Sequence, residues 1–175
     1  MTTIVLTGFM GTGKSTVGRL LAQRLGKPFI DVDERIERRT GLTIAEIFAR
    51  HGEPFFRQVE QQELAAALVE DAVVATGGGA IADPHNLARM KQAGPIVCLT
   101  ASVDAILART SADRSRPLLQ HDDRRARVEA LLSERAPAYA QADICIDTTE
   151  RSPEEVVEAI LVYLGTILSP QELPA

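Results

Sequence analysis

The hydrophobic positions of this chain form two kinds of segment that alternate from one end to the other. Short runs of adjacent apolar residues, rich in β-branched side chains, predict buried strands. Longer stretches between them repeat apolar residues every three or four positions and predict helices. The expected strands are Thr3–Thr7, Pro28–Asp31, Ala72–Thr76, Pro95–Thr100 and Ile144–Ile146. This alternation predicts an α/β fold with a five-stranded parallel sheet and helices on both faces.

Start signals predict where several helices begin. Thr43 and Glu46 form a capping-box pattern, and a longer helix is expected from about Pro54 to Val69. Proline as the first helical residue after a capping side chain is a further start signal. It occurs at Asp83-Pro84 and at Ser152-Pro153.

We expect one domain of residues 1–168, followed by a frayed tail at 169–175. Residues 111–123 are polar, carry several arginines and lack periodicity. They are either a solvated loop or, in an enzyme that transfers phosphate, a mobile lid that excludes water.

Composition excludes several classes of protein. A net charge of -5 argues against nucleic acid as a partner, and no apolar stretch is long enough to span a membrane. The chain enters its first strand at once, which leaves no room for a signal peptide and favours the cytoplasm. Cys98 and Cys145 lie in apolar runs and are expected to be buried free thiols, with a disulfide as the less favoured alternative.

The segment Gly8–Ser15 matches the phosphate-binding P-loop, G-x-x-x-x-G-K-[ST], between a predicted strand and a predicted helix. Such a loop directs backbone N–H groups at the phosphates of ATP. Lys14 would bridge the β- and γ-phosphates, and Ser15 would bind Mg²⁺. The other loop positions expected to hold the nucleotide are Gly11, Thr12, Gly13 and Thr16. The alternative is a glycine-rich turn that binds nothing.

Asp31 and Asp33 follow the second strand, on the ligand-binding side of a doubly wound sheet. Asp31 could hold Mg²⁺ directly or through water, since this ion favours oxygen ligands. Asp33 could contact the accepting hydroxyl and help remove its proton. The alternative is that one of them only caps the next helix.

Three further segments carry candidate binding groups. Arg57 lies three residues before Glu60, either as a surface pair or as a guanidinium that a carboxylate orients toward an anionic ligand. Gly77-Gly78-Gly79 follows the third strand, where close backbone approach to a ligand or a tight turn would explain it. Arg116 lies in the candidate lid and could neutralise a transferring phosphoryl group. Arg135 could bind a ligand or offset a helix dipole.

Read in order, these segments resemble the shikimate kinase family over nearly the whole chain. The resemblance rests on the P-loop, Asp31-Val32-Asp33, the Phe-Arg-x-x-Glu segment around Arg57, the triple glycine, the Arg-Pro-Leu-Leu lid and the Arg-Ala-Pro-x-Tyr segment at Arg135. Ile146-Asp147-Thr148, followed by Pro153, is similar to the adenine-binding loop of that family.

The resemblance implies a three-layer P-loop NTPase fold with a substrate-binding helical segment at 33–61, and a monomer. It implies transfer of the γ-phosphate of ATP to the 3-hydroxyl of shikimate, on the route to chorismate and aromatic amino acids. It implies that Glu60 holds Arg57, that Arg109 lies near adenine, and that Lys14 and Arg116 stabilise the transferring phosphoryl. The implied shikimate-binding residues are Asp33, Arg57, Gly78, Gly79 and Arg135. Like its relatives, the chain lacks an acidic residue ending strand three, which assigns Mg²⁺ to Ser15 and Asp31.

Other classes of function remain open at this level. A different P-loop kinase, for example one acting on gluconate, would share the nucleotide half of the site. A nucleotide-binding regulatory module is a second alternative, although the Asn-Lys-x-Asp and Asp-x-x-Gly motifs of guanine switches are missing. A kinase-like protein without activity is a third, and the presence of Lys14, Asp31, Asp33 and Arg116 argues against it.

Overall fold

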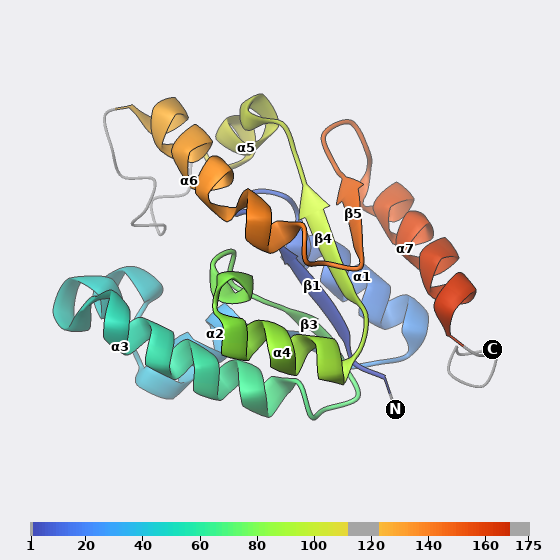
Figure 1. Ribbon diagram of the computed structural model, residues 1–175, viewed down its shortest axis with the longest axis horizontal. Coiled ribbons are helices and arrows are strands. Elements are labelled where there is room, and N and C mark those ends of the chain that lie inside the picture. The colour runs from blue at the N-terminus through green and yellow to red at the C-terminus, as the bar shows by residue number, and fades with distance from the viewer. Residues whose placement is uncertain (1, 112–122, 169–175) are drawn as a thin grey trace.

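A computed structural model describes residues 2–111 and 123–168. Its centre is a five-stranded parallel sheet with the strand order β2-β3-β1-β4-β5 (Figure 1). The strands are β1 (Ile4–Gly8), β2 (Phe29–Asp31), β3 (Val73–Ala75), β4 (Ile96–Thr100) and β5 (Ile144–Asp147). Each begins and ends within two residues of the run that predicts it. The predicted five-stranded parallel sheet is therefore confirmed.

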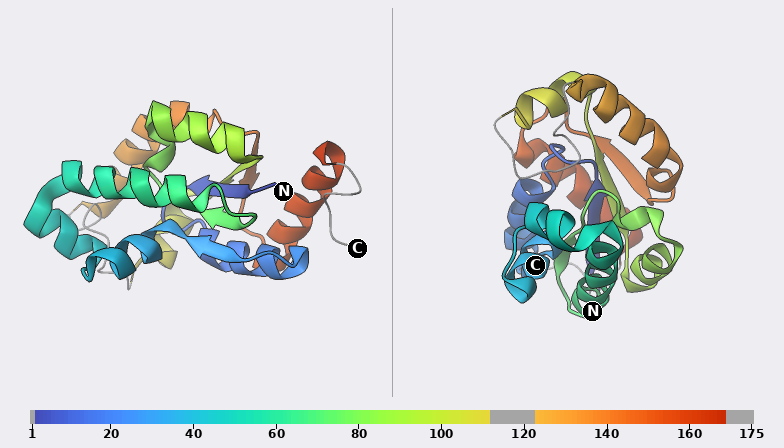
Figure 2. Two further views of the ribbon diagram at one scale, coloured as in Figure 1. Left: turned by 90° about the horizontal axis from the view of Figure 1, so that it is seen from below. Right: turned by 90° about the vertical axis from the view of Figure 1, so that its left-hand side faces the viewer.

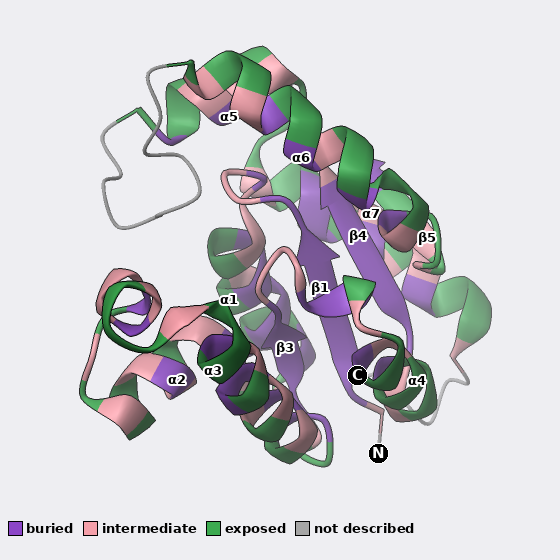
Figure 3. Cartoon of the chain, turned by 60° about the vertical axis from the view of Figure 1, so that its left-hand side comes forward, coloured by how far each residue is buried: buried purple, intermediate pink, exposed green. Residues whose placement is uncertain are grey.

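Helices cover both faces of the sheet (Figures 1 and 2). One layer consists of α1 (Lys14–Leu25) and α7 (Pro153–Ile167). The other consists of α2 (Val32–Thr40), α3 (Ile44–Ala67), α4 (Pro84–Ala93), α5 (Val103–Arg109), α6 (Arg124–Tyr139) and the short 3₁₀ helix η1 (Ala80–Ala82). Successive strand side chains alternate between the layers, since Ile4 and Leu6 pack toward α1 and α7 while Val5 packs toward α3. The central strands are therefore buried on both sides (Figure 3).

The long helix α3 is broken once. Gly52 has φ 80° and ψ 171° within the 24-residue span, and Pro54 begins the second segment. A positive φ is unfavourable for residues with a Cβ, so glycine permits the break at this position. The second segment starts at the proline from which the sequence predicts a helix, and it carries Arg57 and Glu60 toward the sheet edge.

The predicted caps are present. The side chains of Thr43 and Ser152 each accept a hydrogen bond from the backbone N–H of a glutamate three residues later. The carboxylate of that glutamate in turn accepts a hydrogen bond from the backbone N–H of the capping residue. Asp83 accepts from the N–H groups of His85 and Asn86. None of the described helices is both long and apolar enough to cross a bilayer.

One expectation about the cysteines is wrong. Both thiols are free and Cys98 is buried, but Cys145 is exposed. The reason is that β5 is an edge strand whose other face, at Ile146, packs into the layer formed by α1 and α7. Most of the predicted lid and the predicted tail lie outside the described residues.

Candidate active site

The functional residues lie where β1, β2 and β3 end at one edge of the sheet. The P-loop follows β1, Asp31 ends β2, and the triple glycine follows β3. Because β3 lies between β2 and β1, these three segments are spatial neighbours although the chain separates them widely. The edge at which parallel strands end is the usual binding edge of such sheets.

Lys14 lies across the P-loop. Its Nζ donates to the carbonyl oxygens of Gly8, at 2.7 Å, and Phe9, at 3.0 Å. The Thr12 hydroxyl donates to the same Phe9 carbonyl at 2.7 Å. Through these bonds Lys14 and Thr12 link the end of the P-loop back to its first residues. The cavity beside it, of about 670 Å³, is lined by Met10, Gly11, Gly13, Lys14, Ser15, Thr16, Asp31, Asp33 and residues Ala75 to Gly78.

Ser15 and Asp31, the two expected metal ligands, are in direct contact. The Ser15 hydroxyl donates to Asp31 Oδ2 at 2.7 Å. Asp31 Oδ1 accepts from the N–H of Asp33, at 3.0 Å, and from that of Glu34, at 3.3 Å, so Asp31 is the cap of α2. Two oxygen donors beside a phosphate-binding loop fit Mg²⁺, which takes few protein ligands and completes its shell with phosphate and water.

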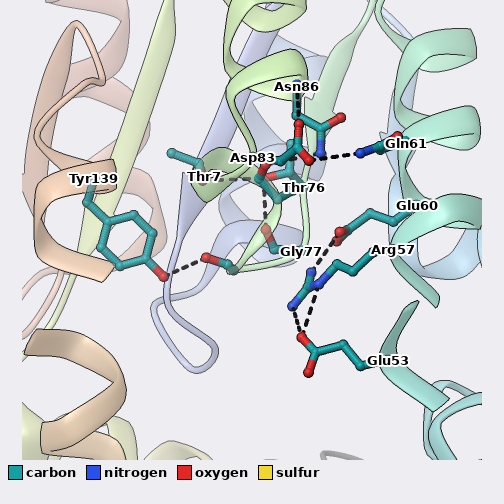
Figure 4. Close-up of polar contacts among 12 residues, drawn as sticks. Thr7, Glu53, Arg57, Glu60, Gln61, Thr76, Gly77, Asp83, Asn86 and Tyr139 are labelled. Atoms are coloured by element: carbon teal, nitrogen blue, oxygen red, sulfur yellow. Dashed lines mark hydrogen bonds and ion pairs between the residues drawn. The ribbon is translucent and has the colours of Figure 1, made fainter. Parts of the chain in front are cut away.

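Arg57 and Glu60 form the pair that their spacing predicts (Figure 4). Arg57 NH1 lies 2.7 Å from Glu60 Oε2, and the Glu60 side chain is only 1% exposed. Desolvation raises the pKa of Glu60 above its usual range, with Asp33 adding to the rise and Arg57 opposing it. Burial alone would lower the pKa of Arg57, but Glu60 and Glu53 together raise it. Arg57 therefore stays positively charged at the cavity wall.

The triple glycine leaves room for charged groups to approach the backbone. A Cβ at Gly77 would lie 2.7 Å from Glu60 Oε1 and 3.2 Å from Asp33 Oδ1. A Cβ at Gly79 would lie 2.8 Å from Arg57 NH2. A Cβ at Gly78 would lie 3.1 Å from the Gly8 carbonyl oxygen, in the P-loop. Close packing of charged side chains and loops accounts for glycine at all three positions.

Arg135 enters the site from α6, and two aromatic residues set its environment. Its side chain is buried, with its guanidinium carbon 5.6 Å from the centre of the Phe9 ring. Tyr139, one turn later, donates its hydroxyl to the Gly78 carbonyl at 2.7 Å. Burial raises the pKa of Tyr139 to about 12, so this donor stays protonated. The sequence interpretation missed Tyr139 as a support for the glycine segment, although its spacing of four from Arg135 was the available signal.

A cavity of about 430 Å³ lies between these groups. Its polar wall carries Asp33, Arg57, Glu60, Arg135 and the three glycines, and its apolar wall carries Met10, Ile44, Phe48 and Phe56. Met10, Asp33, Gly77 and Gly78 also line the P-loop cavity. The two cavities therefore adjoin, so a molecule bound in one would lie next to a molecule bound in the other. The apolar wall was not recognised from the sequence, because Phe48 and Phe56 also fit ordinary core positions.

Arg109 and Thr148 link the loop after β5 to the P-loop. Arg109 donates to the Thr148 carbonyl at 2.7 Å and to the Gly11 carbonyl at 3.2 Å. A third cavity, of about 720 Å³, is lined by Gly11 to Gly13, Thr16, Arg109, Thr148, Arg151 and Pro153 among others. Arg109 and the loop after Asp147, both expected near adenine, line this cavity together, and their contact with adenine stays a prediction. Arg116 lies outside the described residues.

Comparison with known proteins identifies the family. The family model described as "SKI: Shikimate kinase" matches residues 10–164. The chain belongs to the shikimate kinase family. Shikimate kinase of Geobacter sulfurreducens is 49% identical over 162 residues, which cover 92% of this chain and 90% of the relative. That of Thermodesulfovibrio yellowstonii is 46% identical over 92% of this chain and 94% of the relative.

Solved structures of shikimate kinases have the same fold. The enzyme from Acinetobacter baumannii, in complex with shikimate, superposes with a TM-score of 0.92 at 40% identity, covering 97% of this chain and 96% of the other. The enzyme from Bacteroides thetaiotaomicron gives 0.85 at 34% identity, covering 94% and 98%. The family and the P-loop fold predicted from the sequence are thereby confirmed, and the predicted phosphorylation of shikimate agrees with the names of these relatives.

Proposed function

We propose that the two adjoining cavities bind ATP and shikimate, and that the γ-phosphate passes to the 3-hydroxyl of shikimate at their junction. The observation that carries this assignment is the shared wall, because Asp33, Gly77 and Gly78 line both cavities. A group on that wall can contact the acceptor and the donor at once. The product is shikimate 3-phosphate, an intermediate on the route to chorismate.

Arg57 and Arg135 bind the carboxylate of shikimate in this proposal. They come from different elements, α3 and α6, and both line the acceptor cavity. Arginine binds a carboxylate through parallel N–H groups, which fixes the orientation of the acid as well as its position. Gly78 and Gly79 complete the contact, since their lack of a side chain lets the acceptor approach the backbone closely.

Asp33 accepts the proton of the 3-hydroxyl. As the hydroxyl oxygen forms its bond to the γ-phosphorus, the bond between that phosphorus and the bridging oxygen of ADP breaks. Lys14 and Arg116 stabilise the charge on the transferring phosphoryl group. Arg109 lies near adenine, while Gly11, Thr12, Gly13 and Thr16 hold the phosphates.

Ser15 and Asp31 would hold Mg²⁺, since their oxygens lie together beside the phosphate cavity. The ion, when bound, neutralises phosphate charge. The single domain of residues 1–168, with its acceptor segment at 33–61 and lid at 111–123, stays a prediction from the sequence. The same holds for the monomeric state, the cytoplasmic location and the expectation of no nucleic-acid or membrane partner.

The test measures ADP release from MgATP with shikimate, quinate or gluconate, and without an acceptor. We expect release that depends on shikimate alone. Release with gluconate would keep the P-loop chemistry but overturn the assignment of the acceptor cavity. Tight ATP binding with no release for any acceptor would favour a regulatory module.

A further inference from the structure

Arg57 is held by two carboxylates of contrasting character (Figure 4). Glu60 is 1% exposed and approaches NH1 at 2.7 Å. Glu53 is 55% exposed and uses one oxygen, Oε1, to accept from both Nε, at 3.3 Å, and NH2, at 3.1 Å. The buried contact is short and the exposed contact is long, so the two glutamates hold Arg57 with unequal strength.

Glu53 can leave Arg57 at little cost, whereas Glu60 cannot. It follows the break at Gly52, at the start of the helical segment that carries Arg57. More than half of its side chain already contacts water, and exposed pairs of this kind contribute little to stability. Glu60 cannot move into water in this way, because separating its buried carboxylate from Arg57 would leave a buried charge unpaired.

Glu53 occupies donors that suit a ligand carboxylate. The Nε–H group and the adjacent NH2 group form one fork of the guanidinium, and a carboxylate binds such a fork best with two oxygens. Glu53 contacts both donors with one oxygen. A carboxylate in the acceptor cavity, which Arg57 lines, could replace that single-oxygen contact with two bonds.

The charge balance points the same way. With Glu53 in place, the three carboxylates of Asp33, Glu53 and Glu60 face the two guanidiniums of Arg57 and Arg135. Once Glu53 has moved into water, two carboxylates face two guanidiniums. The second arrangement repels an anionic acceptor less than the first.

We propose that Glu53 is a displaceable carboxylate, which occupies one fork of Arg57 in the free enzyme and yields it to the carboxylate of the acceptor. This inference rests on the proposed binding of shikimate to Arg57. Glu53 is then a specificity-determining residue. It sets the affinity for the acid by competing with it, and it occupies the Nε and NH2 donors of Arg57 until an acid arrives.

The test compares Glu53→Gln with the unmodified protein. Removal of the competing charge should lower the KM and Kd for shikimate about two- to fivefold, the range expected for one exposed ion pair. The gain should shrink at high salt, because salt screens the competition. The KM for ATP and kcat should not change. The methyl ester of shikimate, which lacks the competing charge, should bind both proteins equally.

Glu158→Gln is the matched control. Glu158 is 57% exposed and pairs with Arg24 at 2.7 Å, in the helix layer made by α1 and α7. This variant removes the same charge and should leave the shikimate KM unchanged. Equal effects in both variants, an equal gain for the methyl ester, or a higher shikimate KM in Glu53→Gln would each overturn displacement. If the unmodified protein releases no ADP with shikimate, the proposed function fails instead.

Discussion

The Thr148 hydroxyl lies 3.0 Å from the carbonyl oxygen of Thr12, which joins the loop after β5 to the P-loop across 136 residues of chain. The same hydroxyl lies 3.0 Å from the Thr100 carbonyl and accepts from Arg109 NH1 at 3.0 Å. One buried side chain therefore connects the ends of β4 and β5 with the phosphate loop. We therefore expect the relative position of the proposed adenine and phosphate subsites to depend on this side chain.

Thr148→Val should weaken this connection while keeping the β-branched shape of the side chain. The substitution leaves the carbonyl of Thr12 without its partner, which costs about 1–3 kcal/mol of unfolding free energy. The Kd for ATP should rise, while the shikimate KM changes little. Denaturant unfolding and calorimetric ATP titration measure the two effects. Thr166→Val, at an exposed position of α7, is the control; equal losses in both variants would contradict the role of Thr148.

Arg57→Lys should weaken acceptor binding far more than ATP binding. An ammonium keeps the charge but cannot reproduce the guanidinium fork. We expect the shikimate KM to rise at least about tenfold, which corresponds to about 1.4 kcal/mol. Steady-state kinetics with each substrate varied in turn gives the comparison. Arg50→Lys, on the same helix but paired with Glu46, is the control. Equal losses for both substrates would remove Arg57 from the carboxylate site.

Gly79→Ala should displace the Arg57 guanidinium. The added Cβ would lie 2.8 Å from NH2 and 3.1 Å from NH1, and the flexible arginine must move to accommodate it. The shikimate KM should rise about tenfold. Stability should change little, because the added Cβ meets only the far end of a flexible side chain. In Gly165→Ala the added Cβ meets no atom within 4 Å, so this variant should raise the unfolding free energy by about 0.5–1 kcal/mol. An unaltered shikimate KM in Gly79→Ala would contradict the close approach.

Glu60 should make stability fall as pH rises. Burial raises the pKa of Glu60 in the folded protein above its ordinary value of 4.5, so the folded state binds more protons than the unfolded chain in that range. The unfolding free energy therefore decreases as pH increases from the ordinary value through the raised one. Glu60→Gln should lose this part of the pH dependence. Denaturant unfolding of both proteins from about pH 4 upward measures it; parallel curves would show that Glu60 titrates normally.

Much of the fold was predictable because its signals are local. A capping box at Thr43 or Ser152 lies within four residues, and an apolar run such as Ile96–Thr100 carries its own strand preference. The P-loop is likewise continuous in sequence. For this reason the strands, the helix starts and the phosphate loop could be located before any coordinate was known.

Exposure and three-dimensional proximity could not be predicted from such local signals, since they depend on elements far apart in the chain. Cys145 lies in an apolar run yet is exposed, because β5 is at the edge of the sheet. No local pattern distinguishes the buried Glu60 from the exposed Glu53, although both contact Arg57.

The amino-acid sequence by itself determined the α/β class, the nucleotide loop and the family. The tertiary structure brought Tyr139 onto Gly78 and Thr148 onto Thr12, and it placed Asp33 and Glu60 against Gly77. The physical reason is that hydrogen bonding along the chain and apolar periodicity act over a few residues. Burial, and with it the pKa of Glu60 and the displaceability of Glu53, is set by packing between distant segments.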